Sequence, residues 1–200
     1  SGNVFVVMFD LINAATSQTS PTVMVEAEVR DELGYASGFM SGWEMTRPST
    51  DLYGVANGAN PLEVVVPSFS IKSIQQSNPL TNEQNTLKVT LSANLNLAAG
   101  STITISGLTG SQTEDTSTLS VSSTSDLFGT TGVWSQNSGQ LVLTAELQGA
   151  TSGTDFVLIF DLVNPATHQT APLVSVGATI MDSGSVVGSI DTVLMTSRID

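Results

Sequence analysis

One motif occurs twice in this chain, and the spacing of its two copies limits how the chain can fold. The first copy opens with "GNVFVVMFDLINAATSQTSP" and the second with "GTDFVLIFDLVNPATHQTAP". Residues 2–27 and 153–178 align without a gap at an offset of 151, with 15 identities in 26 positions. This density of matches indicates a tandem repeat, so the two segments are expected to form the same elements in two domains.

The residues around the second copy alternate apolar and polar side chains, which is the pattern of half-buried β-strands. Glycine-rich turns separate the alternating runs, and "GLTGSQT" and "FGTTGVW" are interpreted as hairpin loops. Short strands at this spacing predict an all-β fold, an antiparallel two-sheet sandwich of Ig-like or jelly-roll type. The predicted strands are 69–77, 86–94, 101–108, 117–123, 140–148, 155–163 and 172–180.

The phase of the repeat predicts an incomplete sandwich at the start of the chain. Five predicted strands precede the motif in the second copy, and none precedes it in the first. Residues 1–31 are therefore expected to be the terminal strand pair of a preceding or neighbouring sandwich, because two strands alone are only marginally stable. The predicted domains are this strand pair, an ordered connector at 32–67 with one strand at 39–46, the complete sandwich at 68–182, and the start of the next connector at 183–200.

The start of the chain is interpreted as part of a longer protein. Ser1 stands where a translation product carries methionine, so we expect that translation starts upstream of it. The apolar run at 4–9 lacks a basic flank and is followed by Asp10, which favours a strand over a signal peptide.

Charge and composition exclude several classes of function. The chain has 5 basic and 18 acidic residues and a net charge of −13, so no basic patch is available for nucleic acid or an anionic membrane surface. No apolar run approaches the ~20 residues of a membrane span, so no membrane insertion is expected. The absence of cysteine excludes disulfides, thiolate chemistry and cysteine-based zinc sites.

No motif predicts catalysis, so the chain is not expected to be an enzyme and no cofactor is expected. His168, the only histidine, aligns with Ser17 in the first copy, so the repeat does not require an imidazole. Calcium is the one metal left as an alternative, at the acidic pair Glu114 and Asp115 with Asp126 nearby. No EF-hand-type spacing supports it. Asp10 and Asp161 occupy the same position in both copies, which favours a structural role over a catalytic one.

Serine and threonine replace the charged residues that usually cover a soluble domain. There are 27 Ser and 25 Thr, whereas Lys72 and Lys88 are the only lysines. Uncharged sheet edges of this kind favour pairing with another chain unless something covers them. O-linked glycans on the hydroxyls are one hypothesis, since no N-glycosylation sequon is present. The alternative is that Ser and Thr are simply favourable residues on exposed strands.

Three segments, "NLAAGSTITISGLTG", "FGTTGVW" and "LVLTAEL", precede an F-x-L-x-N-P strand at 160–165. With them, residues 65–182 resemble a tandem repeat found in very long secreted proteins of algae and other protists. The resemblance implies a β-sandwich unit of an extracellular surface or filament protein with a glycan coat. It implies no catalytic residue.

The repeat and the composition together predict a structural subunit of an extracellular filament or surface coat. Self-association into a polymer is expected head to tail, through β-sandwich repeats and strand complementation. The alternative is a carbohydrate-binding adhesin or stalk module that uses an exposed aromatic residue such as Trp134 or Tyr53. The residues expected at the assembly interface are Phe5, Val7, Phe9, Tyr35, Phe39 and Trp43.

Overall fold

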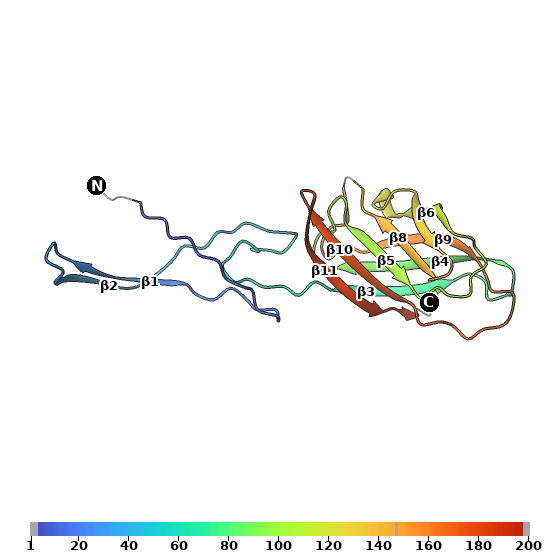
Figure 1. The fold of residues 1–200 in the computed structure, drawn as a ribbon, viewed down its shortest axis with the longest axis horizontal. Helices are drawn as coiled ribbons and strands as arrows, with labels where there is room; N and C mark the ends of the chain where they lie inside the picture. The colour runs from blue at the N-terminus through green and yellow to red at the C-terminus, as the bar shows by residue number, and fades with distance from the viewer. Residues whose placement is uncertain (1–3, 147, 198–200) are drawn as a thin grey trace. The chain divides into compact units, whose positions relative to one another are not determined.

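The computed structural model describes residues 4–146 and 148–197, and they form two compact units built almost entirely of strands and loops (Figure 1). Unit 1 comprises Ser1–Leu52 and Ala56–Val66. Unit 2 comprises Tyr53–Val55 and Pro67–Asp200. One short 3-10 turn, η1 (Thr124–Asp126), interrupts the strands of unit 2.

Unit 2 is a sandwich of two sheets that share one strand, β6. Neighbouring strands are antiparallel except for the short β12, which runs parallel to β3. The all-β two-sheet fold predicted from the sequence is thus confirmed. The first sheet, in spatial order, contains β12 (Thr196–Ser197), β3 (Phe69–Gln76), β4 (Gln84–Ala93), β9 (Phe156–Val163) and β6 (Thr116–Ser123). The second continues from β6 through β7 (Thr131–Ser135), β8 (Gln140–Thr144), β5 (Thr102–Ser106), β10 (Ser175–Asp182) and β11 (Ser185–Leu194).

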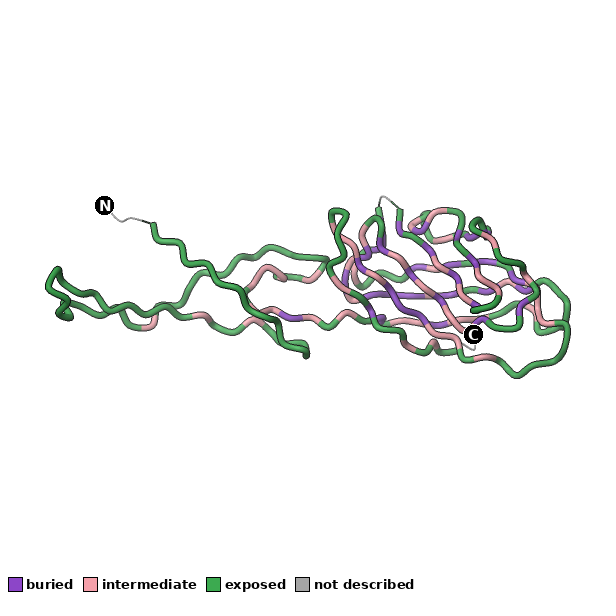
Figure 2. Tube along the Cα trace, in the orientation of Figure 1, coloured by how far each residue is buried: buried purple, intermediate pink, exposed green. Residues whose placement is uncertain are grey.

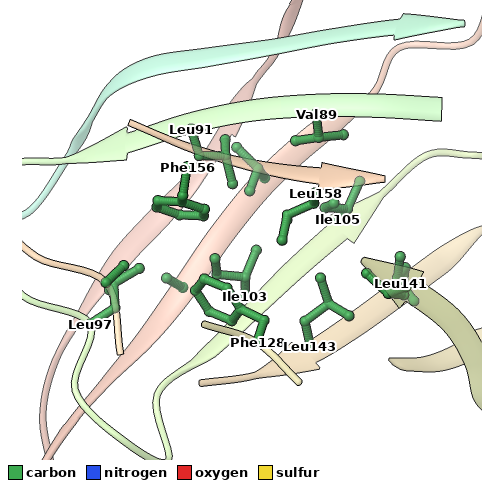
Figure 3. Close-up of a cluster of buried hydrophobic side chains, with 14 of the residues drawn as sticks. Val89, Leu91, Leu97, Ile103, Ile105, Phe128, Leu141, Leu143, Phe156 and Leu158 are labelled. Atoms are coloured by element: carbon green, nitrogen blue, oxygen red, sulfur yellow. The ribbon is translucent and has the colours of Figure 1, made fainter. Parts of the chain in front are cut away.

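The core lies between the two sheets and follows from the alternation of side chains along each strand. β4 and β9 contribute alternate residues from one sheet, and β5, β8 and β10 contribute them from the other (Figure 3). Phe128 closes the core from the turn after η1, with its ring centroid 5.1 Å from that of Phe156. The largest fully buried side chains are Trp134, Phe128, Phe156, Phe160, Leu91, Leu97, Ile103, Ile105, Leu141, Leu143, Leu158 and Val89.

Strand β9 is internal to the first sheet. It pairs antiparallel with β4 along its full length, and its central residues also pair with β6. Phe160 lies opposite Leu87 on one side and Val121 on the other. Burial alternates along β9, and Ile159 on its outer side is 37% exposed, so the continuous apolar run does not reflect burial on both faces.

Two predictions about unit 2 were wrong. "FGTTGVW" contains strand β7 and is not only a loop. Gly132 lies within β7, where it packs against β8 and does not form a turn. A Cβ at this position would be 2.6 Å from a side-chain carbon of Leu143, so only glycine fits there. Residues 183–200 were assigned to the next connector, but β11 lies in this range and pairs with β10 in the second sheet.

Unit 1 contains one hairpin, β1 (Met24–Arg30) paired with β2 (Ala36–Glu44). β2 lies within the range that was predicted to be connector and overlaps the strand predicted at 39–46. The strand predicted in the apolar run at 4–9 is absent: residues 4–12 belong to no strand because no strand of the described chain pairs with them, and no hydrogen bond joins them to the rest of it. Among the described residues of unit 1, only Val64 is buried.

The repeat supplies a matched pair of substitutions that tests this difference in burial. Phe160 is 2% exposed and Phe9, its counterpart, is 74% exposed. Phe160→Ala is expected to lower the free energy of unfolding by about 3–5 kcal/mol, and Phe9→Ala by less than about 0.5 kcal/mol. Urea unfolding followed by circular dichroism measures both. Equal losses in the two variants would contradict the burial described here.

Candidate assembly surface

The most exposed apolar segment of the chain is the extended stretch at residues 4–12. Phe5 is 87% exposed and Ile12 is 99% exposed, and the whole stretch is drawn as exposed in Figure 2. Every apolar residue from Val4 to Ile12 lies on this surface. Folded proteins rarely expose so many adjacent large apolar side chains, so this segment is a strong candidate for an interaction surface.

The second copy of the motif shows which side chains of this segment belong in a core. In β9 the alternate residues Phe156, Leu158, Phe160 and Leu162 are buried. At an offset of 151, the matching residues of unit 1 are Phe5, Val7, Phe9 and Leu11. The first three were predicted from the sequence. Leu11 was missed, although its place in the alternation identifies it.

The β1–β2 hairpin repeats the β10–β11 hairpin of unit 2. Val176, Ala178 and Ile180 of β10 are buried in the sandwich. Their counterparts in β1 are Val25, Ala27 and Val29, and all three are exposed. The apolar face of β1 therefore lacks a covering sheet, and the free edge of β1 lacks the strand that β5 provides to β10.

The pairing registers of the two hairpins show that the offset of 151, which holds for residues 2–27, does not extend to β2 and β11. Val25 lies opposite Trp43, and its counterpart Val176 lies opposite Val193. The loop of the first hairpin is thus one residue longer, and the offset falls to 150 in β2. Trp43 accordingly takes the place of Val193, which packs against the core.

The same register shift changes the interpretation of three other residues in unit 1. Met40 takes the place of Ile190, which is buried, so Met40 lies on the core-facing side of β2 and was missed. Phe39 takes the place of the exposed Ser189, and Tyr35 lies in the hairpin loop. Phe39 and Tyr35 are 67% and 71% exposed.

The polar residues at the end of β9 have structural partners in unit 2. The carboxylate of Asp161 accepts hydrogen bonds from Thr86 Oγ1 (2.6 Å) and Gln84 Nε2 (2.8 Å), both on β4. The amide of Asn164 donates to the carbonyls of Asn78 and Leu80. The repeated Asp and Asn of the motif therefore fasten β9 and the following loop to the β3–β4 hairpin.

The residues considered for other chemistry do not gather into a site. His168 lies exposed in the loop after β9, and the Asp115 carboxylate accepts a hydrogen bond from the backbone N–H of Gln136. Within the described ranges, no group of three or more His, Asp or Glu side chains is placed to hold a metal ion. Trp134 is buried, and its indole N–H donates to the carbonyl of Thr113, so it is not the exposed aromatic residue proposed for an adhesin.

No protein-family model matches this chain, and neither does any curated protein. Among solved structures, the chain is similar to the RrgA Jo.In complex, with 11% sequence identity and a TM-score of 0.39. The match covers 60% of this chain and 74% of the other. No helix within the described residues is long and apolar enough to cross a membrane.

Limited proteolysis tests whether the apolar segment is accessible. Chymotrypsin is expected to cut after Phe5 and Phe9 well before it cuts after Phe156 or Phe160, because cleavage requires an exposed and unpaired backbone. Mass spectrometry of a time course identifies the cut sites. Resistance of Phe5 and Phe9 over the whole time course would show that residues 4–12 are covered in solution.

Proposed function

We propose that this chain is a structural repeat of an extracellular filament or surface coat. The observation that carries the proposal is the presence of two copies of the β9 motif, one buried within a sandwich and one exposed in unit 1. Unit 1 supplies the equivalents of β9, β10 and β11. To complete a sandwich it needs six further strands of the kind formed by β3 to β8.

The register within unit 2 predicts how the strands of unit 1 would dock. Residues 4–12 would enter between a β4-type and a β6-type strand. Phe9 would then lie opposite the equivalents of Leu87 and Val121, as Phe160 does. β1 would pair with a β5-type strand, with Val25 opposite the equivalent of Ile105. Burial of each large apolar side chain would contribute about 1.5–3 kcal/mol.

The sandwich of unit 2 is not the acceptor while it is intact, because β9 already fills the place between β4 and β6. The acceptor is therefore a repeat in which this place is open. It is either an earlier part of the same polypeptide or a second molecule. In the first case the contact completes a sandwich within one chain; in the second the donor and acceptor surfaces differ, so the contact is head to tail and builds an open polymer where the rotation between molecules does not close a ring.

The surface of the sandwich supports an extracellular setting with O-linked glycans as part of the proposal. Ser117, Thr118, Ser120 and Ser122 of β6 are exposed, while Leu119 and Val121 between them are buried. This strand presents a row of hydroxyls without charge. Glycans on such a row would keep neighbouring filaments from pairing along their sheets.

An extended chain tests the docking directly. Ser1 corresponds to Ser152, so placing residues 53–151 ahead of Ser1 supplies the six missing strands in register. Amide hydrogen exchange at residues 4–12 is expected to slow on the order of a hundredfold or more relative to the original chain, because these amides become ladder donors.

Two matched variants of the extended chain control for nonspecific collapse. Phe9→Asp places a charge on the core-facing side and is expected to abolish the protection. Met8→Asp lies on the opposite side, where the counterpart Ile159 is exposed, and is expected to keep it. Exchange at residues 4–12 that stays fast in the unmodified extended chain would overturn the docking.

Mass spectrometry of native material under denaturing conditions distinguishes the two sources of the acceptor. A mass many times 20.8 kDa indicates covalent tandem repeats, whereas a mass near 20.8 kDa indicates a discrete subunit whose acceptor is a different chain with an open place between its β4-type and β6-type strands. A fall in mass on treatment with O-glycosidases tests the glycans. Electron microscopy that finds only monomers at all concentrations would contradict a filament and favour the adhesin alternative.

A further inference from the structure

In unit 1, the loop that follows the repeated strand is hydrogen-bonded to residues 61–66, which begin in a turn at Pro61 and Leu62. The backbone N–H of Gln18 donates to the carbonyl of Val64 (2.9 Å), and the N–H of Val64 donates to the carbonyl of Gln18 (3.0 Å). This pair forms an isolated antiparallel bridge between residues 16–21 and residues 61–66. The bridge has the local geometry of a two-stranded sheet.

Side chains on both partners add hydrogen bonds to this contact between residues 16–21 and 61–66, which we call the clamp. Gln18 Nε2 donates to the carbonyl of Leu62 (2.8 Å), and Ser20 Oγ donates to the carbonyl of Pro61 (2.7 Å). In the other direction, the backbone N–H of Ser20 donates to the carboxylate of Glu63 (2.7 Å). Val64 is 8% exposed in the middle of the segment. The contact therefore joins residues 16–21 to residues 61–66 through both backbone and side-chain hydrogen bonds.

The same loop occurs in unit 2, with its backbone available. Gln169 is the counterpart of Gln18 and is exposed. Its side-chain amide donates to the carbonyl of Thr109 within its own sandwich. No hydrogen bond to its backbone N–H or carbonyl is recorded anywhere in residues 4–146 and 148–197.

An open groove borders this loop. It has a volume of about 980 Å³ and lies entirely within unit 2. Its lining combines apolar side chains with uncharged polar ones, and no Asp, Glu, Lys or Arg of the described residues lines it, which suits a largely apolar segment that also forms hydrogen bonds. Residues along the groove include Leu80, Leu108, His168, Gln169, Pro172 and Leu173.

We propose that the loop at residues 167–172 is the docking site for a segment of the kind "PLEVVV", residues 61–66 of a following repeat, in the conformation that this segment has in unit 1. This inference rests on the proposed head-to-tail arrangement of repeats. Gln169 pairs its backbone with the Val64 equivalent, and the N–H of Ala171 takes the Glu63 equivalent, as Ser20 does in unit 1. His168 stands at the position of Ser17, whose Oγ accepts the N–H of Val66 (3.0 Å), and an imidazole ring nitrogen can accept the same hydrogen bond.

The clamp would restrict the connector between repeats, because residues 61–66 lie directly ahead of a sandwich. Residues 61–66 end three positions before β3 begins at Phe69. A repeat that holds this segment therefore restricts the chain immediately ahead of the next sandwich. A clamp at every junction makes a filament stiffer than one with free connectors of the same length.

The absence of cysteine allows a crosslink to test the clamp. Because the offset is 150 from β2 onward, Asp200 corresponds to Thr50, so the full chain followed by residues 51–200 continues the repeat in register. In this extended chain, Gln169→Cys is combined with Val64→Cys in the appended copy. Bridge partners have Cα separations that a disulfide spans.

Two further cysteine pairs serve as controls for the rate of disulfide formation. Gln18→Cys with Val64→Cys in the first copy joins residues that pair in the structure and is the positive control. Thr170→Cys with the appended Val64→Cys is the matched negative control, since it has the same tether but Thr170 does not line the groove. Oxidation of the Gln169 pair is expected to be about tenfold or more faster than that of the Thr170 pair, because docking raises the effective concentration. Equal rates would overturn the clamp.

A second measurement uses the chain without extension. A synthetic peptide of residues 59–68 is titrated into the full chain, and the imidazole signals of His168 are followed by NMR, since it is the only histidine. A saturable shift that Gln169→Pro removes supports the clamp, because proline lacks the N–H donor. No shift at millimolar peptide, with equal crosslinking rates, rejects it. Protection of residues 4–12 in the N-terminally extended chain would survive that result, so the two proposals fail separately.

Discussion

The structure depends on the burial of one strand, β9, between β4 and β6. Its alternate side chains Phe156, Leu158, Phe160 and Leu162 fill the space between the two sheets, and both of its backbone edges are paired. The loop after β9 is fastened through Asn164, and β10 then continues into the opposite sheet. Removing β9 would separate β4 from β6 and open the core along its length. The exposed copy at residues 4–12 carries the same core-facing side chains, so we infer that it fills the same place in another sandwich.

Two kinds of contact connect the proposed repeats, and both use the backbone of extended segments. The first is the apolar strand at residues 4–12, which needs a sandwich with an open central place. The second is the loop bearing Gln18 or Gln169, which holds a short segment ahead of the next sandwich. Burial supplies most of the free energy of the first contact, whereas hydrogen bonds supply the specificity of the second. Neither contact is self-complementary, so each gives the assembly a direction.

Alternation predicted most strands of unit 2 correctly, because side chains on a half-buried strand must alternate between core and solvent. β7 was missed because Gly132, which resembles a turn residue in sequence, is required by close packing against Leu143. β11 was missed because bulges against β10 disturb its alternation. In the assembly surface, Met40 was missed because the hairpin loop of unit 1 is one residue longer, a shift that an ungapped alignment does not reveal.

The sequence by itself determined the repeat, its phase and the side of each strand that belongs in a core, because these follow from residue identity and a period of two. It also identified the lack of cysteine and the hydroxyl-rich surface. Only the tertiary structure decided which copy is buried. Phe9 and Phe160 stand in nearly identical sequences, yet one is exposed and the other lies in the core. The physical reason is that burial is a property of neighbours: Phe160 has β4 and β6 beside it, and Phe9 has neither.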